Sequence, residues 1–203
     1  MLESVVVEAK APRAVATVFV LHGRGSNARD MLPLAEALDL AALRYVFVEA
    51  PLAVAGLPGG RQWYEFTAEH DRGIKASTDL LLAAVAAHGT EPPSVFLGFS
   101  QGAVLSLSAG LHLLPPPAAI VALSGYFAPA QPLPPRNGAP LPPSLLVHGN
   151  ADQVIPVEFG REAERNLRAL GVPVEYREFP LGHQIDQAVL AAIRAFLRSH
   201  LAL

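Results

Sequence analysis

The chain has 203 residues, of which 51% are hydrophobic and 16% charged, and its formal net charge at pH 7 is −3. This length suits one sizeable hydrophobic core and is short for two domains with a linker, so we expect a single domain over residues 1–203. The slightly acidic balance argues against nucleic acid or an anionic membrane as the main partner. The sequence contains no cysteine, which excludes disulfide bonds and a thiol nucleophile.

The N-terminus has no signature of a secretory signal. Residues 1–4 lead directly into an apolar run, without the basic region and long apolar segment of a signal peptide. No apolar run approaches the roughly 20 residues that a transmembrane helix needs. We therefore expect a cytoplasmic protein without a membrane span.

Apolar runs of strand length alternate with segments of helical period along the chain. The expected strands are residues 4–7, 16–21, 45–49, 94–98, 118–123, 144–148 and 174–179, and the expected helices are 31–38, 78–88, 102–113, 157–170 and 184–201. The alternation predicts an α/β fold in which a mostly parallel, twisted sheet carries helices on both faces. The first strand is followed by only a short polar turn, and we expect it to pair antiparallel.

A proline-rich stretch at residues 129–143 interrupts this pattern. Its simplest interpretation is a surface connector. The stretch is too short and too rich in proline to build a helical lid between two late strands. We therefore expect an open, shallow site.

The pentapeptide GFSQG at residues 98–102 follows an apolar run and precedes a helix of small residues. This pattern is typical of a strand, a sharp turn and a helix, with Ser100 at the bend. A serine hydroxyl becomes a useful nucleophile only when it is presented to a base beside hydrogen-bond donors for the developing oxyanion. The pentapeptide alone leaves a second interpretation open, in which Ser100 is an ordinary helix N-cap.

A bend of this type is followed along the chain by an acid and then a histidine, each on a loop after a strand. Of the downstream histidines, His112 and His148 precede every suitable acid, and His200 falls in the last helical turn. This leaves His183 as the base. Asp152 is the best acid, because it lies just past the strand 144–148. For each of the two, helix capping or turn chemistry is the alternative interpretation.

A glycine-rich loop, His-Gly-Arg-Gly, follows the strand 16–21. Two backbone N–H groups aimed at the former carbonyl oxygen stabilise a tetrahedral intermediate. We assign these donors to Arg24 and Gln101, and expect His22 to hold the loop. A plain turn or a phosphate cradle is the alternative, but neither phosphate-binding glycine pattern is present.

Several ordered motifs together resemble one family. They are Leu-His-Gly-Arg-Gly at 21–25, Arg-Gln-Trp-Tyr at 61–64, Gly-Phe-Ser-Gln-Gly at 98–102, His-Gly at 148–149 with Asp152, and Gly-His at 182–183. The chain is similar to the phospholipase/carboxylesterase family of small α/β-hydrolases, which includes bacterial carboxylesterases and acyl-protein thioesterases. The resemblance implies a serine esterase with Ser100, Asp152 and His183 as its triad.

The expected function is that of a serine carboxylesterase acting on short- to medium-chain esters through an acyl-enzyme, with a small-molecule ester as partner. We expect the acyl pocket to include Leu57, Trp63, Tyr64, Phe99 and Tyr126, although core packing explains each equally well. No cofactor or metal is expected. Thioesterase, lysophospholipase or acyltransferase activity, a non-catalytic binding protein on the same scaffold, and a homodimer are the open alternatives.

Overall fold

The computed structural model describes residues 2–89 and 91–203. Within these ranges the main sheet has seven strands in the order β1-β3-β2-β6-β7-β8-β9. The strands are β1 (Ser4–Val7), β2 (Ala16–Leu21), β3 (Leu43–Val48), β6 (Ser94–Phe99), β7 (Ala119–Leu123), β8 (Ser144–Gly149) and β9 (Val174–Phe179). All neighbouring pairs are parallel except β1 and β3, so the first strand is antiparallel as predicted. Its partner is β3, which places β1 at the edge of the sheet.

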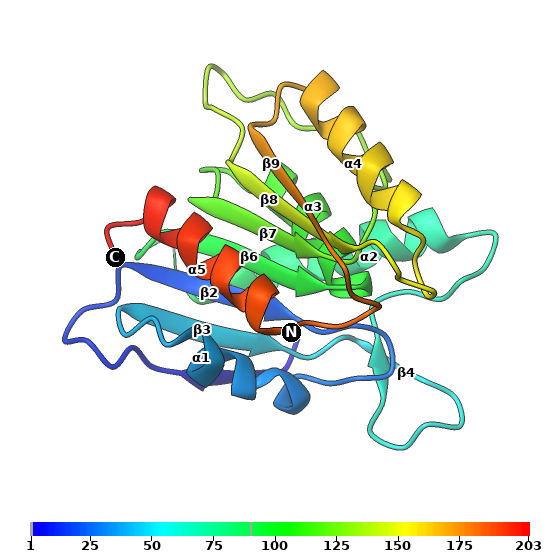
Figure 1. The fold of residues 1–203 in the computed structure, drawn as a ribbon, viewed down its shortest axis with the longest axis horizontal. Coiled ribbons are helices and arrows are strands. Elements are labelled where there is room, and N and C mark those ends of the chain that lie inside the picture. Colours follow the sequence, from blue (N-terminus) through cyan, green and yellow to red (C-terminus); the bar gives the residue numbers. More distant parts are fainter. Residues whose placement is uncertain (1, 90) are drawn as a thin grey trace.

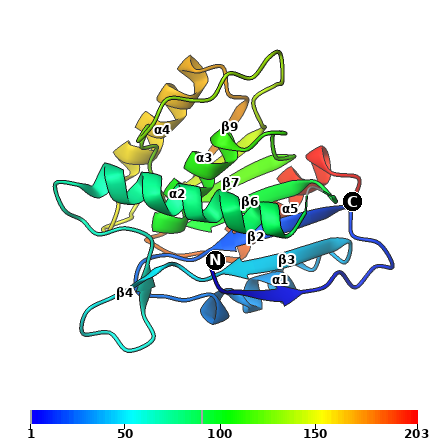
Figure 2. The ribbon, with the colours of Figure 1, turned by 180° about the vertical axis from the view of Figure 1, so that it is seen from behind.

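Helices cover both faces of the sheet (Figures 1 and 2). Helices α1 (Pro33–Leu38) and α5 (Gln187–His200) lie on one face, and α2 (His70–Ala87), α3 (Gln101–His112) and α4 (Val157–Ala169) on the other. A short 3₁₀ helix, η1 (Arg29–Met31), precedes α1. The predicted fold class is thereby confirmed.

The period of two along each strand divides the core between the two faces. In β2, Val18 and Val20 belong to the cluster that includes α1 and α5, whereas Phe19 and Leu21 belong to the cluster that includes α2 and α3. All six residues of β2 are buried. Strands of a parallel sheet with both faces covered are expected to be continuously apolar in this way.

Helix α2 begins at His70, eight residues before the predicted start at position 78. Its first turns contain one large apolar side chain, that of Ile74, which is fully buried, so the apolar period is too weak to indicate them. Tertiary contacts extend the helix instead. Gly73 packs closely against Tyr64, and the Ser77 hydroxyl donates a hydrogen bond to the carbonyl oxygen of Trp63.

Two further differences lie near the site. A two-stranded hairpin, β4 (Leu52–Ala53) with β5 (Arg61–Gln62), was not predicted, because strands of two residues carry no periodic signal. Helix α5 begins at Gln187 rather than 184, since the Asp186 side chain accepts a hydrogen bond from the Val189 N–H and caps it. Residues 124–143, between β7 and β8, contain neither helix nor strand, which confirms that this segment builds no helical lid.

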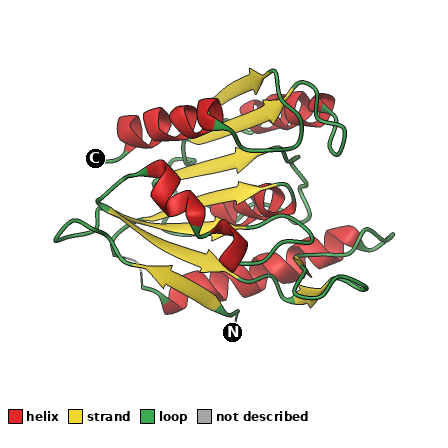
Figure 3. Ribbon diagram, turned by 60° about the horizontal axis from the view of Figure 1, so that its bottom comes forward, coloured by secondary structure: helices red, strands yellow, loops and turns green. Residues whose placement is uncertain are grey.

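The parallel strands end at one edge of the sheet, where their following loops gather (Figure 3). The loops after β2, β6, β7, β8 and β9 therefore meet there, although they come from distant parts of the sequence. In open α/β sheets this edge is where ligands bind.

Candidate active site

Ser100 lies on the bend between β6 and α3, in a backbone conformation that side chains rarely adopt. Its φ is 56° and its ψ is −119°, a combination that costs about 1–3 kcal/mol for a residue other than glycine. Its side chain makes no capping hydrogen bond to α3, so the interpretation as an ordinary N-cap is wrong. The strain lifts the hydroxyl out of the regular backbone.

The flanking glycines show how this bend is enforced. A Cβ on Gly98 would overlap the carbonyl of Gly102, and a Cβ on Gly102 would overlap the carbonyl of Leu21. The start of α3 therefore passes the ends of β6 and β2 in backbone contact. Only glycine at both positions permits this approach.

Asp152 and His183 are joined by a hydrogen bond. The Asp152 side chain is fully buried, and its Oδ2 lies 2.7 Å from Nδ1 of His183. Its other oxygen, Oδ1, accepts hydrogen bonds from the N–H groups of Val154 (2.8 Å) and Ile155 (2.9 Å). Because a carboxylate only accepts, Nδ1 of His183 carries a hydrogen, and in the neutral imidazole this leaves Nε2 with a lone pair.

Burial alone would raise the pKa of the Asp152 carboxyl, but the hydrogen bonds from His183, Ile155 and Val154 outweigh burial and lower the pKa below its ordinary value. The acid is therefore ionised at neutral pH. His148, which chain order excluded as the base, lies behind it. Its Nε2 is 3.6 Å from Oδ2 of Asp152 and donates to the carbonyl of Ile155 at 2.8 Å.

Ser100 and His183 line one cavity of about 690 Å³. The His183 ring packs on Phe99, with ring centroids 4.7 Å apart, and so stands beside the residue that precedes Ser100. In this conformation no hydrogen bond joins the Ser100 hydroxyl to His183. Hydrogen bonds of this kind are often long or misaligned without substrate and tighten when it binds.

The backbone N–H groups of Arg24 and Gln101 are free to bind a ligand. In the described ranges, neither N–H donates a hydrogen bond to an acceptor outside helix α3. Gln101 is the first residue of α3, and the first N–H groups of a helix have no partner within it. The loop after β2 lies against Ser100, since a Cβ on Gly23 would be 3.2 Å from Cβ of Ser100. The N–H groups at the two predicted positions are thus unpaired among the described residues.

The side chain of Gln101 has a role that the sequence did not indicate. Its Oε1 accepts from the Trp63 N–H at 3.0 Å, and its Nε2 donates to the Tyr64 carbonyl at 2.9 Å. These bonds fasten the segment after β5 to the start of α3. No local pattern predicts a contact between residues so far apart in the sequence.

Of the predicted pocket residues, Phe99, Tyr64 and Tyr126 line the cavity. Trp63 is fully buried and Leu57 packs on Gly25 and Gly60, and neither is among the lining residues. The two tyrosine hydroxyls lie 2.9 Å apart, and burial raises the pKa of both, so both stay protonated.

The cavity wall contains further residues that sequence reasoning missed. Phe66 and Val154 are each 66% exposed and Phe159 is 47% exposed, and Met31, Ile155, Pro156 and Ile185 complete the apolar lining. Among the described residues that line the cavity, Arg24 alone carries a permanent formal charge. The cavity is accordingly suited to an apolar ligand with a reactive group above Ser100.

Within residues 2–89 and 91–203, no cluster of three or more histidine or acidic side chains is arranged to hold a metal ion. No helix there combines the length and apolarity needed to cross a membrane.

A mostly parallel sheet with a strained serine on the turn into a helix, and an acid and a histidine paired on later loops, defines the α/β-hydrolases. Residues 2–201 match the phospholipase/carboxylesterase family, and the chain belongs to it. It is thus a hydrolase of the α/β-hydrolase type.

Individual relatives agree with this assignment. The crystal structure of esterase PE8 is 32% identical, with a TM-score of 0.85 over 98% of this chain and 99% of that one. Acyl-protein thioesterase 1 of Gibberella zeae is 26% identical, covering 94% of this chain and 93% of the relative. A protein of Oryza sativa subsp. japonica named as a probable inactive carboxylesterase is 28% identical, covering 87% and 81%.

Proposed function

We propose that the protein is a serine carboxylesterase that hydrolyses short- to medium-chain carboxylic esters through an acyl-enzyme on Ser100. The observation that carries the proposal is the 2.7 Å hydrogen bond between Asp152 and His183, because His183 lines the same cavity as Ser100. The bond orients the imidazole with its lone pair on Nε2, which is the form a general base requires.

The mechanism has two half-reactions. As Oγ of Ser100 attacks the ester carbonyl, Nε2 of His183 takes the hydroxyl proton, and Asp152 stabilises the resulting imidazolium. The N–H groups of Arg24 and Gln101 bind the oxyanion. The imidazolium then protonates the leaving alcohol as the C–O bond breaks, and water repeats the sequence on the acyl-enzyme.

The experiment combines labelling with kinetics. A fluorophosphonate should modify Ser100 in the wild type, and Ser100→Ala should lower kcat for 4-nitrophenyl butanoate by at least about 10³-fold and abolish labelling. Ser199→Ala is the matched control, because Ser199 lies near the end of α5 and its hydroxyl donates a hydrogen bond to the Phe196 carbonyl. Labelling of another residue, or near-normal hydrolysis by Ser100→Ala, would reject the assignment.

Hydrolysis of acyl thioesters or lysolipids is the second candidate. Relatives named acyl-protein thioesterase 1 and the exposed apolar lining of Phe66, Val154 and Phe159 favour it. Matched oxygen esters and thioesters of the same acyl chain separate the two functions, and an added alcohol tests for acyl transfer. A kcat/KM at least about tenfold higher for thioesters, beyond their difference in intrinsic reactivity, would favour the thioesterase.

A further inference from the structure

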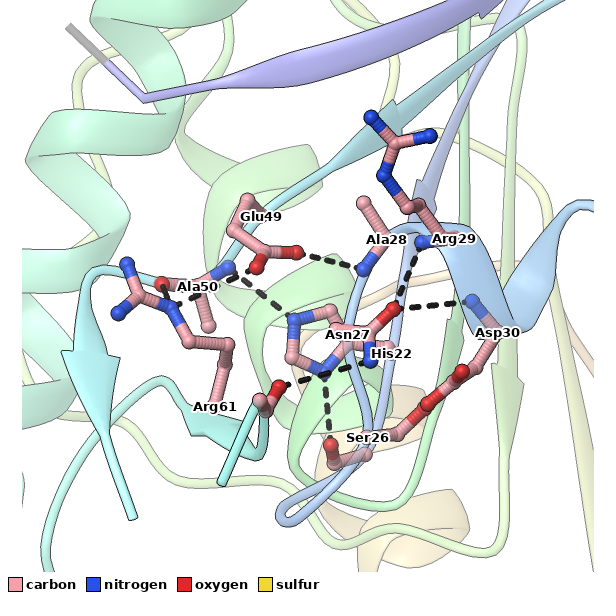
Figure 4. A network of polar contacts seen from close by, with 11 residues as sticks. His22, Ser26, Asn27, Ala28, Arg29, Asp30, Glu49, Ala50 and Arg61 are labelled. Atoms are coloured by element: carbon pink, nitrogen blue, oxygen red, sulfur yellow. Dashed lines mark hydrogen bonds and ion pairs between the residues drawn. The ribbon is translucent and has the colours of Figure 1, made fainter. Parts of the chain in front are cut away.

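A polar network that includes residues from outside the loop holds the loop after β2 in place (Figure 4). Oε2 of Glu49 accepts from the Ala28 N–H at 2.6 Å. Nε of Arg61 donates to the Ala50 carbonyl at 3.0 Å and is 3.5 Å from Oε1 of Glu49. The Gly25 N–H donates to the Arg61 carbonyl at 2.8 Å. Residues just after β3 and on β5 therefore clamp this loop.

His22 stands at the centre of the network, and its partners determine which ring nitrogen carries the proton. The Ala50 N–H donates to Nε2 at 3.1 Å, so Nε2 must hold a lone pair. Nδ1 therefore carries the hydrogen, and it lies 2.7 Å from the carbonyl oxygen of Gly23. The ring is fully buried and packs beside the Trp63 indole, with centroids 5.6 Å apart.

The imidazole is neutral in this setting. Burial lowers the pKa of His22, and the nearby Arg61 lowers it further, whereas the Gly23 carbonyl, Glu49 and Asp30 raise it by less. A proton on Nε2 would also point at the Ala50 N–H. Neutral His22 is therefore one acceptor and one donor, each with a single partner.

The Gly23 carbonyl and the Arg24 N–H belong to the same peptide group. That group is planar and trans, so its C=O and N–H point in opposite directions. A hydrogen bond that fixes the carbonyl oxygen therefore fixes the direction of the Arg24 N–H. Glycines precede and follow Arg24, and Gly25 has a φ of 85°, so this backbone has little stiffness of its own.

We propose that His22 is a positioning residue for the oxyanion hole, and that its Nδ1–H aims the Arg24 N–H by holding the other end of the same peptide group. The inference rests on the proposed function, in which Arg24 supplies an oxyanion donor. A donor contributes its full effect only when it is oriented before the charge develops. His22 supplies that orientation without contacting the substrate.

Two substitutions separate this role from simple anchoring of the loop. The side-chain N–H of His22→Asn can replace Nδ1–H and keep the bond to the Gly23 carbonyl, but it leaves the Ala50 N–H unpaired. The side-chain oxygen of His22→Gln can replace Nε2 and keep the bond from Ala50, but the Gly23 carbonyl loses the short bond from Nδ1 and keeps only the longer one from the Ser26 N–H, at 3.3 Å. Each variant keeps one of the two bonds.

We expect His22→Gln to lower kcat about 10- to 100-fold with little change in KM, which is part of the loss seen when an oxyanion donor is removed. His22→Asn should stay within about fivefold of the wild type. Melting temperatures and fluorophosphonate labelling of Ser100 are measured alongside. Equal losses of kcat in both variants, the reverse order, or losses that follow melting temperature would overturn the proposal.

A measurement on the wild type keeps the test decisive if a variant fails to fold. Nitrogen-15 NMR of the His22 ring should show the hydrogen on Nδ1, and a hydrogen on Nε2 would overturn the proposal. Failure of the proposed function gives a different result, since the wild type would then neither hydrolyse esters nor be labelled at Ser100.

Discussion

Asp152→Asn replaces one carboxylate oxygen by an amide NH₂, and the structure predicts which oxygen is lost. Oδ1 of Asp152 accepts two backbone N–H groups, from Val154 and Ile155, whereas Oδ2 accepts only from His183. Turning the NH₂ toward the backbone would leave two partly buried donors unpaired, at about 1–3 kcal/mol each. The NH₂ therefore faces His183.

His183 must respond by accepting on Nδ1 and carrying its hydrogen on Nε2, where it cannot take a proton from Ser100. The productive arrangement then lies about 2–6 kcal/mol higher, which is a population factor of about 30 to 10⁴. The amide also cannot stabilise the imidazolium by charge. We therefore expect kcat to fall toward the upper end, about 10³- to 10⁴-fold, with KM little changed.

The assay is steady-state hydrolysis of 4-nitrophenyl butanoate, with nitrogen-15 NMR to locate the hydrogen on the His183 ring. Asp186→Asn is the matched control, because Asp186 caps α5 only three residues beyond His183 and asparagine caps helices equally well. Its kcat should stay within about twofold of the wild type. Retention of more than about a tenth of wild-type kcat by Asp152→Asn, or a hydrogen still on Nδ1, would refute the reasoning.

Gly102→Ala should lower the free energy of unfolding by about 3 kcal/mol, because its Cβ meets a backbone carbonyl. Gly182→Ala is the control, because the atom nearest to its added Cβ lies 3.8 Å away. Equal losses of unfolding free energy in the two variants, measured by urea unfolding, would contradict the packing argument. Phe159→Ala should lower kcat/KM for an octanoyl ester relative to an acetyl ester by about fivefold, because the ring lines the cavity; a chain-length profile parallel to that of the wild type would reject this. Burial lowers the pKa of His22 in the folded chain. As pH falls below about 6.5, His22 therefore binds a proton in the unfolded chain before it does so in the folded chain. The wild type should thus lose stability below that pH more steeply than His22→Gln, and parallel denaturation curves would argue against a neutral buried ring.

The part of the site that could be predicted depends on the ends of strands. Ser100, Asp152 and His183 each follow a predicted strand, and parallel strands carry their following loops to one edge. The Arg24 loop was predictable for the same reason. Chain order then excluded His112 and His148, and a place in the last helical turn excluded His200. The structure gives His148 a different environment, behind Asp152.

The rest of the site depends on contacts that no local pattern encodes. Phe66 and Val154 lie in irregular segments, and Phe159 is on the exposed side of an amphipathic helix, so an apolar period gives no reason to assign them to a cavity. The bonds of the Gln101 side chain to the segment 63–64 require the hairpin β4–β5, which carries no sequence signal. The single-domain organisation, the cytoplasmic location and a homodimer stay predictions.

The strained backbone angles at position 100 lower the stability of the fold and serve only the proposed catalytic role of Ser100. A glycine could adopt them without strain, so Ser100→Gly would stabilise the fold by about 1–2 kcal/mol while removing the proposed nucleophile. The fold by itself has no thermodynamic reason to keep a hydroxyl there, and under the proposed function the hydroxyl is kept for the reaction alone. If catalysis were no longer selected, this single substitution would give a more stable protein without the proposed activity.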